Sequence, residues 1–133
     1  PLSSHRASEV RGADHEKGAK ALIARMSSGK EIQIVIPAPH RIDMKSLKRI
    51  LGENNIALIS PYDVNELTDC VIGGVPPFGS LWDIDVIVAT RLLDNDNVVC
   101  SAGTREDSFL LPSQSIVELN SALVLDISRP ASE

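Results

Sequence analysis

The sequence has few aromatic residues and few cysteines. One Trp, one Tyr and two Phe occur among 133 residues, so a hydrophobic core must be aliphatic. The two cysteines, Cys70 and Cys100, belong to no CxxC pair, which argues against a disulfide framework or a zinc knuckle. We expect two half-buried free thiols in a reducing cytoplasm.

Long apolar runs are missing as well. No stretch approaches the roughly 18 uncharged apolar residues that a membrane-spanning helix needs. No basic start is followed by an apolar run and a cleavage site, as in a signal peptide. We therefore expect a cytoplasmic protein with no membrane partner. Because the chain starts at Pro1 rather than Met, we also expect that an N-terminal piece is missing.

Charge is distributed unevenly along the chain. The net charge is −5, which argues weakly against a nucleic-acid partner. Residues 1–50, however, hold ten basic and five acidic residues, whereas residues 51–133 hold three basic and thirteen acidic residues. This asymmetry is a hint of a basic face on an acidic body, and of a nucleic-acid partner.

The length and the residue pattern predict one domain over residues 1–133, because domains peak at roughly 100–150 residues. Helical periodicity and capping residues predict helices over residues 3–19, 43–52, 60–69 and 113–120. Branched apolar runs predict strands over residues 20–26, 31–37, 56–59, 84–89, 98–101, 108–111 and 123–127, the first two forming a hairpin. We expect a mixed α+β fold: a mixed, mostly antiparallel sheet of about six to seven strands, surrounded by helices.

The most unusual segment is GGVPPFG, residues 73–79. Two glycines and two prolines in seven residues exclude an ordinary helix or a central strand. Such a loop can bring fixed backbone N–H groups close to a ligand beside an apolar cavity. A plain tight crossover between a helix and a strand explains the same composition.

Single polar residues give weaker signals. Lys20 opens an apolar strand-like run, where its stem can pack and its ammonium can reach a cleft; a surface lysine is the alternative. The three histidines show no metal-ligand spacing, and we read His40 as a loop residue. The HExxH, GxSxG and Walker patterns are absent, and we expect no metal and no cofactor.

Taken in order, four segments resemble the YbaK-type aminoacyl-tRNA deacylase family, which also occurs as the editing insertion of bacterial prolyl-tRNA synthetases. They are a small-residue helix leading to a lysine-bearing strand, an apolar strand with a basic helix, a GxxxP loop, and an alanine-glycine turn with a final helix and strand. In this sequence they read EVRGADHEKGAKALIAR, IQIVIPAPHRIDMKSLKRILG, SPYDVNELTDCVIGGVPPFGS and VVCSAGTREDSFLLPSQSIVELNSALVLDIS.

The resemblance implies a YbaK-like fold and a trans-editing deacylase that hydrolyses a mischarged tRNA without a covalent intermediate. Lys20 matches the family's functionally essential lysine, so the resemblance makes it the catalytic residue. The expected substrate-binding residues are those of the loop and of the alanine-glycine turn: Gly73, Gly74, Val75, Pro76, Pro77, Phe78, Gly79, Ala102 and Gly103. The tRNA backbone is expected to meet a basic face that includes Lys17, Lys45, Lys48 and Arg49.

The expected partners are the acceptor end of a tRNA and an aminoacyl-tRNA synthetase. We expect removal of a small amino acid from tRNA-Pro, with alanine first, and cysteine or serine behind it. The sequence also departs from the family pattern: Ala89 stands where relatives often carry an acid, and the family's N-terminal strand is missing. A non-catalytic module that binds tRNA or protein through the same fold therefore remains the alternative.

Overall fold

The computed structural model describes residues 17–132. The helix predicted over residues 3–19 lies almost entirely outside this range, and Ala19 already belongs to the first strand. Strand β1 (Ala19–Met26) and strand β2 (Glu31–Pro37) form the predicted antiparallel hairpin, with Ala19 opposite Pro37 and Arg25 opposite Glu31. Gly29 adopts a positive φ of 93° in its turn, a conformation that glycine takes up without strain.

The hairpin is the centre of a five-stranded sheet, in the order β4-β1-β2-β5-β8, within the described part of the chain. Strand β4 (Ile56–Leu58) pairs antiparallel with β1, whereas β5 (Asp85–Ala89) and β8 (Leu123–Leu125) continue the sheet in parallel. The mixed α+β class is thus confirmed. The main sheet has five strands rather than six or seven because two predicted strands, over residues 98–101 and 108–111, pair with each other in a small sheet of their own.

These small sheets join β3 (His40–Ile42) to β9 (Ser128–Pro130), and β6 (Asn97–Ser101) to β7 (Ser108–Pro112). The sequence analysis missed β3 and β9 because their sequences, HRI and SRP, contain no apolar run that marks a strand. It assigned His40 to a loop. This was wrong: His40 begins β3 and is buried.

Three short α-helices follow their predicted ranges. Helix α2 (Met44–Leu51) has Asp43 as its N-cap, whose side chain accepts a hydrogen bond from the Ser46 N–H. Its C-cap is Gly52, in the left-handed conformation. Helix α3 is Pro61–Thr68 and helix α4 is Ser113–Asn120, and two 3₁₀ turns, η2 and η3, cover Gly79–Trp82 and Thr90–Asp94. None of the helices in residues 17–132 has the length and apolar character needed to cross a membrane.

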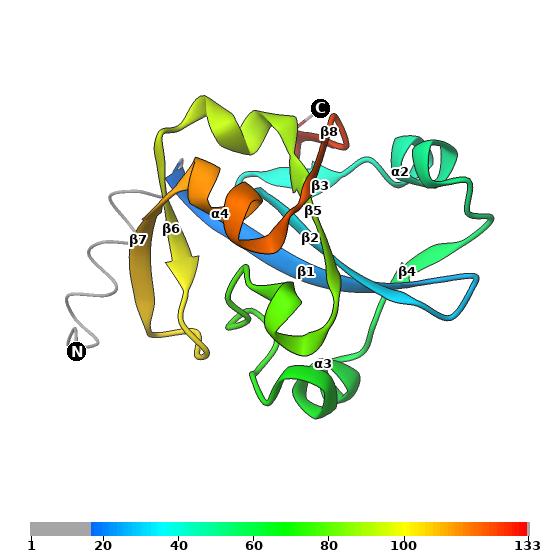
Figure 1. The fold of residues 1–133 in the computed structure, drawn as a ribbon, viewed down its shortest axis with the longest axis horizontal. Helices are drawn as coiled ribbons and strands as arrows, with labels where there is room; N and C mark the ends of the chain where they lie inside the picture. The colour runs from blue at the N-terminus through cyan, green and yellow to red at the C-terminus, as the bar shows by residue number, and fades with distance from the viewer. Residues whose placement is uncertain (1–16, 133) are drawn as a thin grey trace.

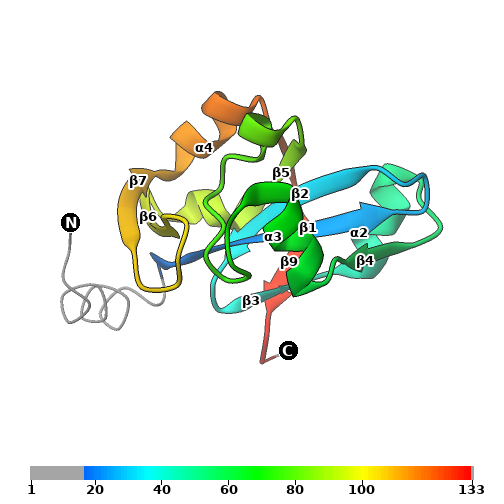
Figure 2. The same ribbon diagram turned by 90° about the horizontal axis from the view of Figure 1, so that it is seen from below.

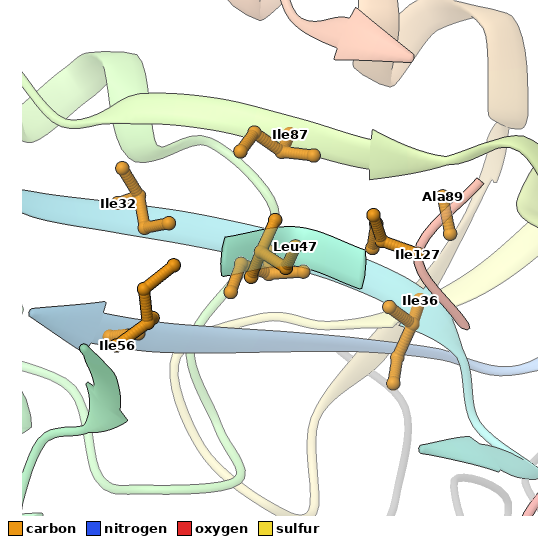
Figure 3. Close-up of a cluster of buried hydrophobic side chains, with 9 residues drawn as sticks. Ile32, Ile36, Leu47, Ile56, Ile87, Ala89 and Ile127 are labelled. Atoms are coloured by element: carbon orange, nitrogen blue, oxygen red, sulfur yellow. The ribbon is translucent and has the colours of Figure 1, made fainter. Parts of the chain in front are cut away.

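Both faces of the main sheet are covered, because side chains alternate along each strand. On one face Ile34 and Ile36 of β2 pack with Leu47 of α2 and with Ile127, and Figure 3 shows Leu47 and Ile127 among the sheet isoleucines. On the other face Val35 packs with side chains of η3, β6 and α4. A third cluster, Ile23, Ile59, Val64, Val75 and Ile84, anchors the glycine-proline loop beneath α3.

Strand β1 is covered unevenly along one edge. Strand β4 pairs only with its last three residues, Ala24–Met26. Near the start of β1, the strand β6 approaches instead, through a parallel bridge between Gly18 and Val99. Figures 1 and 2 show β6 and β7 beside the start of β1, and α2 at the opposite end of the sheet. The edge of β1 near Lys20 is therefore left to face the glycine-proline loop.

Candidate active site

A cavity of about 230 Å³ lies at this edge of β1. Its walls come from three segments distant in sequence: the first half of β1, the glycine-proline loop and strand β6. The lining residues are Gly18, Ala19, Lys20, Ala21, Leu22, Ala38, Gly73, Val75, Val99, Cys100 and Ser101. Most are small or apolar, and among residues 17–132 Lys20 is the one charged side chain in the lining.

Lys20 is half-buried and held in place. Its Nζ donates a hydrogen bond to the backbone carbonyl of His40, at 2.5 Å. Burial lowers the pKa of the Lys20 ammonium from its ordinary value of 10.5. The carbonyl belongs to the β3–β9 pair, in which His40 Nδ1 lies 2.9 Å from the buried Ser128 Oγ. The lysine is thus held by β3, which in turn pairs with the C-terminal strand β9.

Two side-chain amides, one of them fully buried, hold the glycine-proline loop by hydrogen bonds. The fully buried side chain of Gln33 donates from Nε2 to the Pro76 carbonyl at 2.9 Å, and its Oε1 accepts from the Gly79 N–H at 2.8 Å. Asn120 Nδ2 donates to the Pro77 carbonyl at 2.8 Å. A Cβ on Gly79 would lie 3.0 Å from Gln33 Oε1, so the close approach requires glycine here.

The turn between β6 and β7 holds the loop from the other side. The Gly103 N–H donates to the Gly74 carbonyl at 2.8 Å, and Ser101 Oγ donates to the Gly73 carbonyl at 3.0 Å. A Cβ on Gly74 would lie 2.8 Å from the backbone of Thr104, which explains glycine at this position. The alanine-glycine turn thus supports the loop, and its two residues do not line the cavity.

Two N–H groups of the loop have no partner in residues 17–132. Neither Gly73 nor Val75 donates a backbone hydrogen bond there, and both residues line the cavity. Val75 is 4% exposed, and a buried N–H without a partner is uncommon in folded proteins. These two N–H groups belong to lining residues and are therefore candidate donors to a ligand oxygen.

Within residues 17–132, the cavity lining offers no activated nucleophile. Burial raises the pKa of the Cys100 thiol to about 12, which keeps the sulfur protonated near neutral pH. Cys100 is buried and Cys70 is half-buried, and both are free. The described residues contain no cluster of His, Cys, Asp or Glu that could hold a metal ion. The chemistry available here is positioning and electrostatic stabilisation by Lys20 and backbone amides.

The structure brings together only some of the predicted site residues. Lys20, Gly73 and Val75 line the cavity. The other loop residues, Gly74 and Pro76 to Gly79, do not line it, and Pro77 and Gly79 are buried as supports. Lys17 is exposed next to the lining residue Gly18, whereas Lys45, Lys48 and Arg49 lie on α2, at the far end of the sheet (Figure 1).

Sequence reasoning missed every lining residue except Lys20, Gly73 and Val75, and it missed Gln33 and Asn120 as supports of the loop. Gln33 carried a possible signal: it is the one polar side chain facing inward within the run IQIVIP, and its 0% exposure demands hydrogen-bond partners. Ser101 and Ala38 gave no local signal, because their place in the lining depends on the approach of distant segments.

Comparison with known proteins agrees with this geometry. A family model described as the aminoacyl-tRNA editing domain matches residues 3–119. The chain is 27% identical over 128 residues to the multifunctional Ser/Thr-tRNA deacylase ProXp-y of Escherichia coli strain K12, covering 93% of this chain and 77% of that protein. It is 22% identical over 127 residues to a protein of Enterococcus faecalis described as a candidate Cys-tRNA(Pro)/Cys-tRNA(Cys) deacylase, covering 96% and 77% of the two chains.

The fold is shared as well. A solved structure described as a candidate trans-editing enzyme for prolyl-tRNA synthetase superposes with a TM-score of 0.82 at 25% identity, covering 96% of this chain and 80% of that one. Sequence and fold therefore point to the same group of proteins.

Proposed function

This chain belongs to the family of aminoacyl-tRNA editing domains, and from that premise we propose that it is a trans-editing deacylase of mischarged tRNA. One observation carries the proposal. Lys20 and the loop residues Gly73 and Val75, far apart in sequence, line the same small cavity. A fixed ammonium and unpartnered backbone donors among the lining residues of one small cavity suit charge stabilisation at an ester, which supports an enzyme over a module that only binds.

The reaction is the hydrolysis of an activated ester. A water oxygen bonds to the carbonyl carbon, the bond to the ribose oxygen breaks, and the ribose oxygen takes up a proton. The N–H groups of Gly73 and Val75 are suited to bind the carbonyl oxygen as it gains negative charge. The Lys20 ammonium binds the terminal ribose or its phosphate and stabilises the developing charge. The attacking water is activated by a hydroxyl of the substrate's own ribose.

The substrate that we propose is a small amino acid, with alanine first and cysteine or serine behind it, carried by tRNA-Pro. A side cavity of about 40 Å³ adjoins the main one and shares Ala21, Leu22, Gly73 and Val75 with it. Its lining is apolar. A single water needs about 10–15 Å³ on the same measure of volume, so this side cavity has room for a small apolar side chain. The fixed loop excludes a larger side chain by steric hindrance. Steric exclusion of a larger group is easier than rejection of a smaller one.

The named relatives do not settle this choice, since one is named for Ser and Thr and another for Cys. We therefore propose to measure the release of labelled alanine, cysteine, serine and proline from tRNA-Pro by the wild-type chain. The variant Lys20→Ala is expected to lower kcat by about 10²-fold or more, the effect typical of losing one charge-stabilising group. Lys30→Ala is the matched control, because Lys30 pairs with Asp85 on the exposed surface.

Three results would contradict the proposal. No release above the blank, with tRNA binding intact, would identify a binding module of the same fold. Loss of binding as well would remove the connection to tRNA. Equal rates for Lys20→Ala and Lys30→Ala would show that the lysine has no part in the reaction.

A further inference from the structure

After residue 50 the chain has three basic residues, all arginines, and two of them are held in ion pairs. Arg91 Nε lies 3.1 Å from an Asp94 carboxylate oxygen, and Arg129 Nη1 lies 2.7 Å from one of Asp126. Arg105 is exposed, and it forms no ion pair with any residue in the range 17–132. It is therefore the unneutralised cation in the acidic part of the molecule.

Arg105 is also fixed at the rim of the cavity. It lies in the turn between β6 and β7, and its Nε donates to the Ile72 carbonyl at 2.9 Å. Its side chain passes 3.6–3.9 Å from where a Cβ on Gly73 would be, and Gly73 is a lining residue. The arginine is thus packed against the residue with which the glycine-proline loop borders the cavity.

The anchoring bond leaves most of the guanidinium available. An arginine has five N–H donors in a planar fork, and the bond to Ile72 uses the one on Nε. The four donors on Nη1 and Nη2 have no partner within residues 17–132. This fork matches the geometry of a phosphate group, and a side chain that is already held loses less rotamer freedom on binding.

We propose that Arg105 binds the phosphodiester adjacent to the aminoacylated ribose. The inference rests on the proposed function and adds the residue that holds the nucleic-acid backbone at the site. In an aminoacyl-tRNA the ester and the nearest phosphate belong to the same terminal nucleotide. With the ester against Gly73 and Val75, the ribose and its phosphate leave through the rim where Arg105 lies.

Two acidic neighbours in the sequence do not pair with Arg105. Asp107 accepts a hydrogen bond from Thr104 Oγ1 at 2.8 Å, and Glu106 is exposed. Their negative charges weaken the attraction for a phosphate. We therefore expect the contact to contribute a modest factor that decreases with salt, as is usual for exposed charges.

The test compares Arg105→Gln with the matched control Arg91→Gln, which removes the same charge from an exposed, paired arginine. The substrates are two esters of alanine with the ribose 3′-hydroxyl. One is the ester of adenosine, which lacks a phosphate, and the other is the ester of 5′-AMP, which has one. The wild type and the control should prefer the AMP ester. In Arg105→Gln the ratio of the rate on the AMP ester to the rate on the adenosine ester should decrease by roughly fivefold at low salt. The adenosine ester should be hydrolysed at the wild-type rate.

An equal loss on both esters would overturn the inference, because Arg105 would then only support the loop. No change on either ester would also overturn it. If the wild-type chain hydrolyses neither ester nor alanyl-tRNA, the proposed function fails, and binding of a 3′-terminal tRNA oligonucleotide then decides the inference. Arg105→Gln should reduce the slope of log affinity against log salt by about 0.7, the value for one phosphate of a single strand. A slope equal to that of Arg91→Gln would contradict it.

Discussion

At the scale of single residues, the decisive group is Lys20. Its ammonium is half-buried, its acceptor is a backbone carbonyl, and no carboxylate forms an ion pair with it in residues 17–132. Because burial disfavours the charged form of a lysine, its pKa lies below the usual 10.5. A charge that is not neutralised by a neighbour is available to the substrate. The protonation of Lys20 is therefore expected to contribute to the pH dependence of the hydrolysis rate.

This arrangement predicts the alkaline side of the pH profile. An ammonium with a lowered pKa loses its proton at a lower pH than a free lysine does. The enzymatic rate, corrected for spontaneous ester hydrolysis, should therefore decrease with rising pH at values below 10.5. Lys20→Arg keeps a positive charge at all these pH values and should retain activity without this decrease. The measurement is kcat/KM against pH for both proteins, and an identical decrease in Lys20→Arg would assign it to another group.

At the scale of elements, the glycine-proline loop has the conformation that its neighbours impose. Gln33 in the centre of β2 bonds to both Pro76 and Gly79, and Asn120 at the end of α4 bonds to Pro77. The side chain of Phe78 stacks on Phe109 of β7, with ring centroids 6.0 Å apart. Three elements thus hold a segment that has no regular structure of its own.

Replacing Gln33 tests this dependence. Gln33→Leu keeps about the same size but leaves the Pro76 carbonyl and the Gly79 N–H without partners. Each such buried group costs about 1–3 kcal/mol, so the free energy of unfolding should decrease by about 2–6 kcal/mol. Urea unfolding measures this change, and kcat should decrease as well because the loop loses its fixed position. The same replacement at the exposed Gln114 of α4 is the control. Equal stability of the two variants would show that the loop does not depend on Gln33.

At the scale of the whole molecule, the basic residues are spread over both ends of the sheet. Lys17 and Lys20 lie at the cavity end, whereas Lys45, Lys48 and Arg49 lie on α2 at the other end (Figures 1 and 2). A small ester substrate cannot reach both ends at once. A tRNA is large enough to do so, and we propose that helix α2 makes a second contact with the nucleic-acid backbone.

This separation predicts different effects on large and small substrates. The combined variant Lys45→Gln, Lys48→Gln and Arg49→Gln should raise KM for alanyl-tRNA and leave the hydrolysis of alanyl-adenosine unchanged. The salt dependence of tRNA binding should become shallower, because fewer counterions are released. Steady-state kinetics at several salt concentrations tests both effects. An unchanged KM for alanyl-tRNA would exclude α2 from the tRNA contact.

The sequence by itself determined the local structure. The hairpin of β1 and β2 and the ends of helix α2 follow from strand alternation, Gly29, the cap Asp43 and Gly52, which act within a few residues. The resemblance of the lysine strand and of the GxxxP loop to one family was also readable, because both motifs are contiguous. The family and the mixed α+β class followed from these segments.

Only the tertiary structure decided how the site is assembled. The contacts that shape it join residues far apart in the chain, such as His40 to Ser128, Gln33 to Pro76, and Arg105 to Ile72. Each of these contacts depends on which strands become neighbours and on which side chains fill the space between them. Neither the pairing of the strands nor this packing has a local signal in the sequence. For the same reason the basic residues of α2, close to Lys20 in the sequence, lie at the other end of the sheet. Arg105 lies far from Lys20 in the sequence but reaches the rim of its cavity.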